Sequence, residues 1–170
     1  MYGALTMAIE GTIGDEAAVR CLIAAFMAEY VHVIDVGRLE EWPEFFTDDA
    51  KYRICTRENF DLELPLSVLS CFGKGMFRDR ISALRNANVF EPHFYNHVTG
   101  AIRIVDRKAD QIRTESNFQV VRTMVDGGMS LYACGRALDT FVVQSGALKL
   151  SERTVILDSR QIDTLLVIPL

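Results

Sequence analysis

The sequence predicts an α+β domain in which helices come first and a set of antiparallel strands follows. Two observations predict it. The first part of the chain carries apolar residues at helical spacing, whereas the second part consists of long β-rich segments separated by short polar turns. The chain has 170 residues, of which 49% are hydrophobic, and this size suits one domain with a sizeable core. Residues 1–13 are expected to form an N-terminal arm, and residues 14–170 the single domain.

The strongest helical pattern opens the domain. Asp15 and Glu16 precede it, and acidic side chains there suit the positive end of the helix dipole. Gly37 is the expected stop. The apolar stripe follows the spacing i, i+3, i+4, i+7 and i+11 and consists of Val19, Leu22, Ile23, Phe26 and Tyr30.

The next elements are shorter. Leu39–Phe46 reads as a second helix, Thr47–Asp49 as a turn and Lys51–Thr56 as a strand. Residues 58–73 are expected to be an irregular loop or lid, and Met76–Asn86 a third helix. In that helix the expected inward side chains are Phe77, Ile81 and Leu84, and the outward ones are Arg78, Arg80 and Arg85.

The second half is β-rich. The expected strands are Val98–Val105, Ile112–Val125, Ser130–Gln144 and Leu148–Leu157. Residues 126–128 and Ser145-Gly146 have the composition of hairpin connections.

Charge and composition exclude several classes of function. The net charge of −5 argues against a nucleic-acid partner, which requires a clustered basic face. No apolar run reaches the roughly 18 residues of a membrane span, and the N-terminus lacks the pattern of a secretory signal. We therefore expect a cytoplasmic protein. The four cysteines, at positions 21, 55, 71 and 134, form no Cys-x-x-Cys pair and are expected to be buried or half-buried thiols.

Three blocks resemble the small (β) subunits of Rieske non-haem iron aromatic-ring-hydroxylating dioxygenases. The first is the segment from Leu148 to Leu170, whose apolar end suggests docking in a core or on a partner. The second is Glu41–Arg53, with a Trp-x-x-Phe-Phe block before an acidic turn and a strand. The third is Asp79–Arg85 followed by His97-Val98. Together they are spread over residues 20–170, in the order that the family has.

The resemblance implies both fold and assembly. The fold is the cone shared with nuclear transport factor 2 (NTF2), scytalone dehydratase and ketosteroid isomerase, a cystatin-like arrangement with helices packed in a curved, mostly antiparallel sheet. The assembly is an α₃β₃ hetero-hexamer, in which a trimer of β subunits supports three catalytic α subunits. The α subunit would carry the [2Fe–2S] Rieske cluster and a mononuclear Fe(II), and receive electrons from NAD(P)H through a reductase. This chain would be a scaffold for aromatic catabolism.

One stretch departs from part of the family. Partners of naphthalene- or biphenyl-type oxygenases usually have a basic, tryptophan-containing segment between the third helix and the sheet. Here the segment Asn88–His97 has neither feature and is closer to partners of oxygenases for aromatic acids.

The residues predict no catalytic, cofactor-binding or metal site in this chain. A Rieske cluster needs cysteines paired with histidines at short spacing, and none of the four cysteines has a histidine one or two residues after it. His93 and His97 are four apart, but on a strand they lie about 13 Å apart along one face, too far for a shared ion. The strand arginines, Arg103, Arg122, Arg136 and Arg153, are expected on an exposed face or as interface ion-pair donors.

Two other functions stay open. A stand-alone dehydratase or isomerase of the same fold would use acid–base side chains in its pocket. The candidates for that role are Tyr30, His32, Asp35, His93 and His97. Tyr30 is more simply a core aromatic and His97 a hydrogen-bonded structural histidine. The other alternative is a module that binds a small ligand or dimerises without catalysis.

Overall fold

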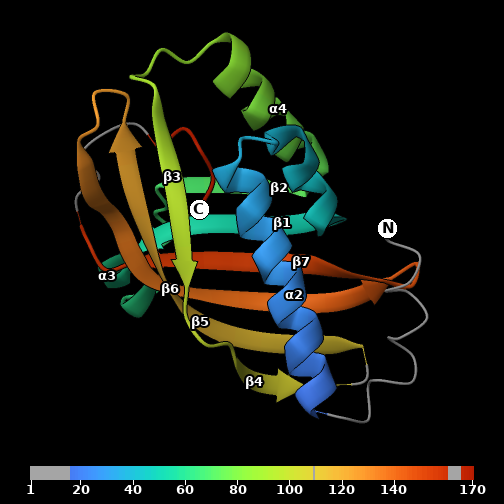
Figure 1. The fold of residues 1–170 in the computed structure, drawn as a ribbon. Helices are drawn as coiled ribbons and strands as arrows, with labels where there is room; N and C mark the ends of the chain where they lie inside the picture. Colours follow the sequence, from blue (N-terminus) through green and yellow to red (C-terminus); the bar gives the residue numbers. More distant parts are fainter. Residues whose placement is uncertain (1–15, 109, 161–165) are drawn as a thin grey trace.

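The computed structural model describes residues 16–108, 110–160 and 166–170. A long helix, α2 (Glu16–Asp35), lies across one face of a large curved sheet, and α4 (Gly73–Asn86) lies at the end of that sheet (Figure 1). This is the predicted α+β architecture, with a mostly antiparallel sheet around the first helix. The expected arm, residues 1–13, lies outside the described residues.

The sheet has seven strands. Their bounds are β1 (Phe46–Thr56), β2 (Leu69–Phe72), β3 (His93–Thr99), β4 (Arg103–Arg107), β5 (Gln111–Met124), β6 (Met129–Gln144) and β7 (Ala147–Leu157). They run in the order β2-β1-β7-β6-β5-β3, and β4 also pairs with β5. β1 and β7 pair in parallel, whereas all other neighbours are antiparallel. The parallel pair places β1, the first strand, beside β7, the last strand, in the interior of the sheet.

The long helix matches its prediction. Val19, Ile23 and Tyr30 are buried on its stripe, and Leu22 and Phe26 pack against the same core. Gly37 has a positive φ of 76° just after the helix ends, where a residue without a Cβ adopts the left-handed conformation at low cost. By length and composition α2 is also long and apolar enough to span a membrane, contrary to the sequence expectation. Here its stripe is instead covered by the sheet.

Two short helical elements precede and follow β1. The expected second helix is a 3₁₀ helix, η1 (Leu39–Phe45), with Pro43 inside it. The segment 58–73 is not one irregular loop. It begins in α3 (Arg57–Asp61), which Thr56 caps by accepting a hydrogen bond from the Asn59 N–H at 3.2 Å, and it ends in the edge strand β2.

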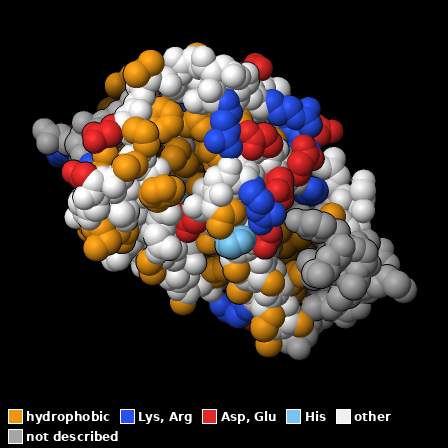
Figure 2. Space-filling view, turned by 45° about the horizontal axis from the view of Figure 1, so that its top comes forward, with side chains coloured by type: hydrophobic (Ala, Val, Ile, Leu, Met, Phe, Trp, Pro, Cys, Tyr) orange, Lys and Arg blue, Asp and Glu red, His pale blue; other side chains and the backbone are white. Residues whose placement is uncertain are grey.

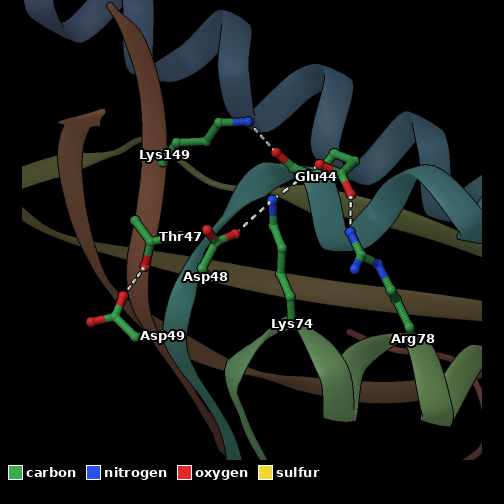
Figure 3. A network of polar contacts seen from close by, with 7 residues as sticks. All are labelled: Glu44, Thr47, Asp48, Asp49, Lys74, Arg78 and Lys149. Atoms are coloured by element: carbon green, nitrogen blue, oxygen red, sulfur yellow. Dashed lines mark hydrogen bonds and ion pairs between the residues drawn. The ribbon is translucent and has the colours of Figure 1, made fainter. Parts of the chain in front are cut away.

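The predicted turn at Thr47–Asp49 was wrong, because these residues belong to β1. The register of β1 against β7 shifts between Phe46 and Lys51, so the turn-forming residues make a bulge instead of a chain reversal. Asp48 joins a network that ties α4 to the strands, whereas the Thr47 hydroxyl donates to the Asp49 carboxylate at 2.9 Å as a separate pair (Figure 3). In this network Nζ of Lys74 lies 3.0 Å from Oε2 of Glu44 and 3.5 Å from Oδ1 of Asp48.

The same network includes two further cations. Arg78 lies 3.1 Å from the Glu44 carboxylate, and the Lys149 ammonium donates to the main-chain oxygen of Glu44 (Figure 3). The hydrogen bond from Lys74 is the main reason why the pKa of Glu44 is below its ordinary value. Glu44 therefore links α4, η1 and β7 through one carboxylate and one carbonyl.

The expected strand Val98–Val105 is two strands, because β3 ends at Thr99 and β4 begins at Arg103. The other three expected strands correspond to β5, β6 and β7. In the third helix, Phe77, Ile81 and Leu84 are buried as predicted. Arg80 was wrongly expected to point outward, since its guanidinium is half-buried and donates to the main-chain oxygen of Leu166.

The core at the α4 end of the sheet is a cluster of aromatic rings. Trp42, Phe46, Tyr52 and Phe77 each have essentially no exposed surface. The Trp42 ring lies 5.3 Å from Phe46, 5.2 Å from Tyr52 and 5.1 Å from Phe77, between ring centroids. Edge-on contacts of this kind add to the stabilisation from burial. The Trp-x-x-Phe-Phe block of the sequence is therefore the centre of the core.

Gly135 in β6 is the position where the sheet leaves no room for a side chain. A Cβ at this residue would lie 1.9 Å from the main-chain oxygen of Ile156 in β7. We expect Gly135→Ala to lower the free energy of unfolding by about 1–3 kcal/mol, the usual cost of overpacking, in chemical denaturation. Gly75→Ala in α4 is the matched control, because nothing lies within 4 Å of its Cβ. Equal stability of the two variants would contradict this close packing.

Candidate functional site

Asp35 and His97 meet where the C-terminal end of α2 reaches β3. One carboxylate oxygen of Asp35 lies 2.6 Å from Nδ1 of His97, and the other accepts the His97 backbone N–H at 2.9 Å. The His97 side chain is 2% exposed and that of Asp35 16%. Two of the five acid–base candidates from the sequence are therefore in direct contact.

An aspartate that fixes an imidazole is the arrangement of a general base, provided that the other ring nitrogen reaches a substrate. Nε2 of His97 is buried and has no hydrogen-bond partner. In this conformation the nitrogen meets only protein atoms, so the contact acts as a tie between α2 and β3.

The remaining histidines lie apart from this contact. His32 is exposed on α2. Nδ1 of His93 lies 2.8 Å from the main-chain oxygen of Glu91, and its ring centroid is 4.9 Å from that of Tyr95. His93 and His97 do lie on one strand, as expected. Across the described ranges, no group of three or more His, Cys, Asp or Glu side chains is placed to hold a metal ion.

The cysteines are dispersed in space as in sequence. Cys55 and Cys71 are buried, Cys134 is half-buried, and all four thiols are free. Cys21 was wrongly expected to be buried, because it lies on the exposed side of α2. Burial raises the pKa of the Cys55 and Cys71 thiols, which therefore stay protonated near neutral pH.

Tyr30 lies in a second polar group inside the core. Its hydroxyl accepts a hydrogen bond from Nε1 of Trp42 at 2.9 Å and donates to the main-chain oxygen of Leu170 at 3.3 Å. The Tyr52 hydroxyl donates to the same oxygen at 2.9 Å. Burial raises the pKa of Tyr30 to about 12, so the hydroxyl remains a proton donor. Tyr30 is thus the satisfied core aromatic that the sequence favoured.

A buried ion pair supports this group from the sheet. Nη1 of Arg153 lies 2.8 and 2.7 Å from the two carboxylate oxygens of Asp139, and the guanidinium carbon is 4.8 Å from the centroid of the Tyr30 ring. Both side chains are almost fully buried. Arg153 was therefore wrongly expected on an exposed face or at an interface.

The end of the chain docks in the core, as predicted. Leu166, Val167 and Leu170 are 6%, 1% and 1% exposed. Leu165, which belonged to the same prediction, lies outside the described residues. Beside the docked segment is a small pocket whose lining is Tyr132, Ala133, Cys134, Leu157, Ser159, Leu166 and Leu170.

Sequence reasoning missed the pair Asp139–Arg153. The turn at Ser145-Gly146 pairs Val142 with Lys149, and this register would place Asp139 opposite Glu152. A register shift between Thr140 and Phe141 brings Arg153 opposite Asp139 instead. No residue type in the sequence marks that bulge.

Comparison with known proteins gives a consistent result. A family model described as the ring hydroxylating beta subunit matches residues 30–164. The small subunit of anthranilate 1,2-dioxygenase from Burkholderia cepacia is 40% identical over 141 residues, which cover 83% of this chain and 88% of that protein. Subunit beta 2 of the terminal oxygenase component of terephthalate 1,2-dioxygenase from a Comamonas species is 40% identical over 148 residues, covering 87% and 96%.

A solved structure agrees with these sequences. It comes from Novosphingobium aromaticivorans and is assigned as the β subunit of an aromatic-ring-hydroxylating dioxygenase. It superimposes with a TM-score of 0.82 at 37% identity and covers 89% of this chain and 96% of its own. The likeness therefore extends over most of the domain.

The buried ion pair yields a stability prediction. Asp139→Ala leaves the Arg153 guanidinium buried without its counter-ion, and we expect a loss of about 3–5 kcal/mol in the free energy of unfolding. Glu41→Ala is the control, because it removes the partner of an exposed ion pair with Arg38, worth about 0–1 kcal/mol. Chemical denaturation of both variants measures the difference. Similar losses in the two would show that Arg153 finds another partner.

Proposed function

The chain belongs to the ring-hydroxylating β-subunit family and serves in the oxygenase component of a dioxygenase, and we propose that its part there is to hold the catalytic α subunits in place. In this proposal three β subunits form a trimer that supports three α subunits in an α₃β₃ hetero-hexamer in the cytoplasm. The β subunit supplies shape and contacts, whereas O₂ activation takes place in α.

The cofactors of the proposed holoenzyme reside in the α subunit. These are a [2Fe–2S] Rieske cluster and a mononuclear Fe(II), with electrons from NAD(P)H through a reductase. The residues of this chain do not fit such groups, because its described histidines, cysteines and carboxylates do not gather around any one point. We derive no step through iron for this subunit.

We propose an aromatic acid as the substrate class of the holoenzyme. Two relatives at 40% identity are named for dioxygenases of anthranilate and terephthalate, both of which are aromatic carboxylates. The sequence of Asn88–His97 also resembles partners of oxygenases for aromatic acids. Its backbone begins β3, and the His93 ring packs against the rings of Phe90 and Tyr95.

The observation that carries the scaffold role is a set of large apolar side chains that the fold holds in solvent. The first group lies between α3 and β2 and is called here the leucine loop. It consists of Leu62, Leu64, Leu66 and Val68, which are 63%, 37%, 65% and 42% exposed. Exposed apolar groups of this kind mark contact sites for other proteins.

The leucine loop is held by one arginine of β1. Nη2 of Arg53 donates to the main-chain oxygens of Leu64 at 2.9 Å and Leu66 at 3.3 Å, and its Nε donates to the Ser67 hydroxyl at 2.7 Å. The loop backbone is therefore positioned before a partner arrives. Binding then costs less conformational entropy than ordering a flexible loop would.

The second group lies on the outer side of the sheet and is called here the β3 face. Phe94, Val98, Met129 and Leu131 are 65%, 52%, 75% and 60% exposed. Phe94 pairs with Thr123, which pairs in turn with Met129, so the three share one side of neighbouring strands. Figure 2 shows one face of the molecule, on which hydrophobic side chains gather over one part and acidic and basic side chains alternate next to them.

One observation favours the alternative function, a stand-alone dehydratase or isomerase. The contact between Asp35 and His97 is what a pocket dehydratase or isomerase would use to orient a base. The enclosed Nε2 weighs against it, and the scaffold role explains the exposed apolar side chains that an isolated enzyme does not need.

The leucine loop gives a prediction for assembly. Leu62→Asp combined with Leu66→Asp places two charges on this surface, and we expect the amount of α subunit that co-purifies, or the β trimer, to fall at least tenfold. Val125→Asp is the control, because Val125 is 67% exposed at a hairpin outside both groups. Size-exclusion chromatography of the co-expressed complex distinguishes the loss of the α subunit from the loss of the β trimer. Intact hexamers in the double variant would rule out the leucine loop as a subunit contact.

The scaffold and enzyme functions predict different turnover for variants of Asp35 and His97. We expect Asp35→Asn and His97→Ala to leave turnover per intact hexamer nearly unchanged, whereas removal of a true general base costs about 10²–10⁴-fold. The measurement normalises product formation to the Rieske absorbance of size-selected hexamers. A hundredfold loss per hexamer in either variant would favour catalysis in this subunit.

A further inference from the structure

Two tyrosine hydroxyls converge on Leu170, and a tryptophan orients one of them. The main-chain oxygen of Leu170 accepts from the hydroxyls of Tyr52 at 2.9 Å and Tyr30 at 3.3 Å. The Leu170 N–H donates back to the Tyr52 hydroxyl at 2.9 Å. Trp42 donates to the Tyr30 hydroxyl and so directs the proton of that hydroxyl toward Leu170. The three side chains come from α2, η1 and β1, far from Leu170 in sequence.

The surroundings of the segment are apolar. Val167 and Leu170 are each 1% exposed, and their neighbours include the rings of the Trp42 cluster and the lining of the small pocket beside Leu166. Besides the hydrogen bonds at Leu170, Arg80 donates to the main-chain oxygen of Leu166. The enclosure therefore resembles a ligand pocket, in which a few placed donors fix an apolar molecule.

We propose that residues 166–170 are a tethered ligand: they occupy a binding site formed by Tyr30, Trp42 and Tyr52, and this site takes an apolar chain that carries an oxygen acceptor. The side chains of Leu166, Val167 and Leu170 supply the apolar part, and the main-chain oxygen of Leu170 is the acceptor. The site lies inside the cone, away from the leucine loop and the β3 face.

The donors define the chemistry of the ligand. The Tyr30 hydroxyl accepts the Trp42 N–H and offers its own proton to the oxygen of Leu170. Burial raises the pKa of both tyrosines, so both keep their protons at neutral pH. A carbonyl or carboxylate oxygen accepts both hydroxyl protons, whereas an alkyl group leaves both protons without an acceptor in an apolar surrounding.

The first test uses the full chain with Leu170→Asp, which places a charge in the apolar end of the site, and the free peptide Leu-Val-Ile-Pro-Leu as probe. Trp42 is the single tryptophan of the chain and reports occupancy by its fluorescence. We expect a red-shifted emission and a lower Tm in the variant. The peptide should reverse both, and the Tm should rise with peptide concentration.

The control peptide is Leu-Val-Ile-Pro-Asp, which keeps the backbone oxygen but loses the apolar end. It should leave emission and Tm unchanged. No effect of either peptide on a folded variant, or equal effects of both, would overturn the proposal.

A second test keeps the proposal open to refutation if Leu170→Asp does not fold. In the full chain, Tyr52→Phe removes one donor to the Leu170 oxygen and the acceptor of its N–H. We expect the Leu170 amide to exchange its hydrogen at least tenfold faster, with amides of the β5–β6 ladder unchanged. Tyr132→Phe is the matched control, since no hydrogen bond to its buried hydroxyl is present.

The pattern of exchange decides the outcome. Faster exchange confined to Leu170 and its neighbours supports a segment that leaves its site as a unit. Unchanged exchange at Leu170, or equal acceleration in Leu170 and the β5–β6 ladder, would show that the segment is an inseparable part of the core and would overturn the proposal. Neither test involves the α subunit, so a failure here leaves the proposed scaffold role untouched.

Discussion

The Tyr30 side chain is the point on which the interior of this domain depends. Its ring rests on the guanidinium of Arg153, and its hydroxyl joins Trp42 to Leu170. Through these contacts one residue of α2 connects η1, β7 and the end of the chain. Because buried polar groups that lose their hydrogen-bond partners destabilise the fold, these contacts fix the helix, the sheet and the C-terminal segment relative to one another. A shift of any one of them leaves a buried donor or charge unsatisfied.

The order and type of the main elements could be predicted from sequence because each has a local cause. The spacing of Val19, Ile23 and Tyr30 indicates a helix whatever it packs against, and Ser145-Gly146 indicates a hairpin between β6 and β7 by its turn chemistry alone. The wrong predictions concern segments in which local residue composition favours one structure and tertiary contacts favour another. Thr47–Asp49 has the composition of a turn, yet pairing of β1 with β7 extends the strand through it.

The polar contacts inside the domain could be predicted only in part. The sequence named Asp35 and His97 in one candidate set, because Asp and His side chains can act as acid and base in a pocket of this fold. Their bond itself depends on how α2 crosses the sheet. The pair Asp139–Arg153 depends on a single bulge in β7, and the two hydroxyls that donate to Leu170 come from α2 and β1. Long-range geometry of this kind leaves no trace in residue spacing.

An enclosed interior favours the surface role that we propose for the domain. The cone of this fold has room for a ligand only if its own chain leaves that room, and here the C-terminal segment and the aromatic cluster take up much of the space. Nε2 of His97, the one nitrogen that Asp35 leaves available for acid–base chemistry, is closed off as well. The outside shows the opposite arrangement, because Arg53 fixes a loop whose leucines point into solvent. A rigid apolar loop is costly for an isolated protein, which must keep it soluble. It is favourable for a subunit, which loses little entropy when the loop is buried against a neighbour.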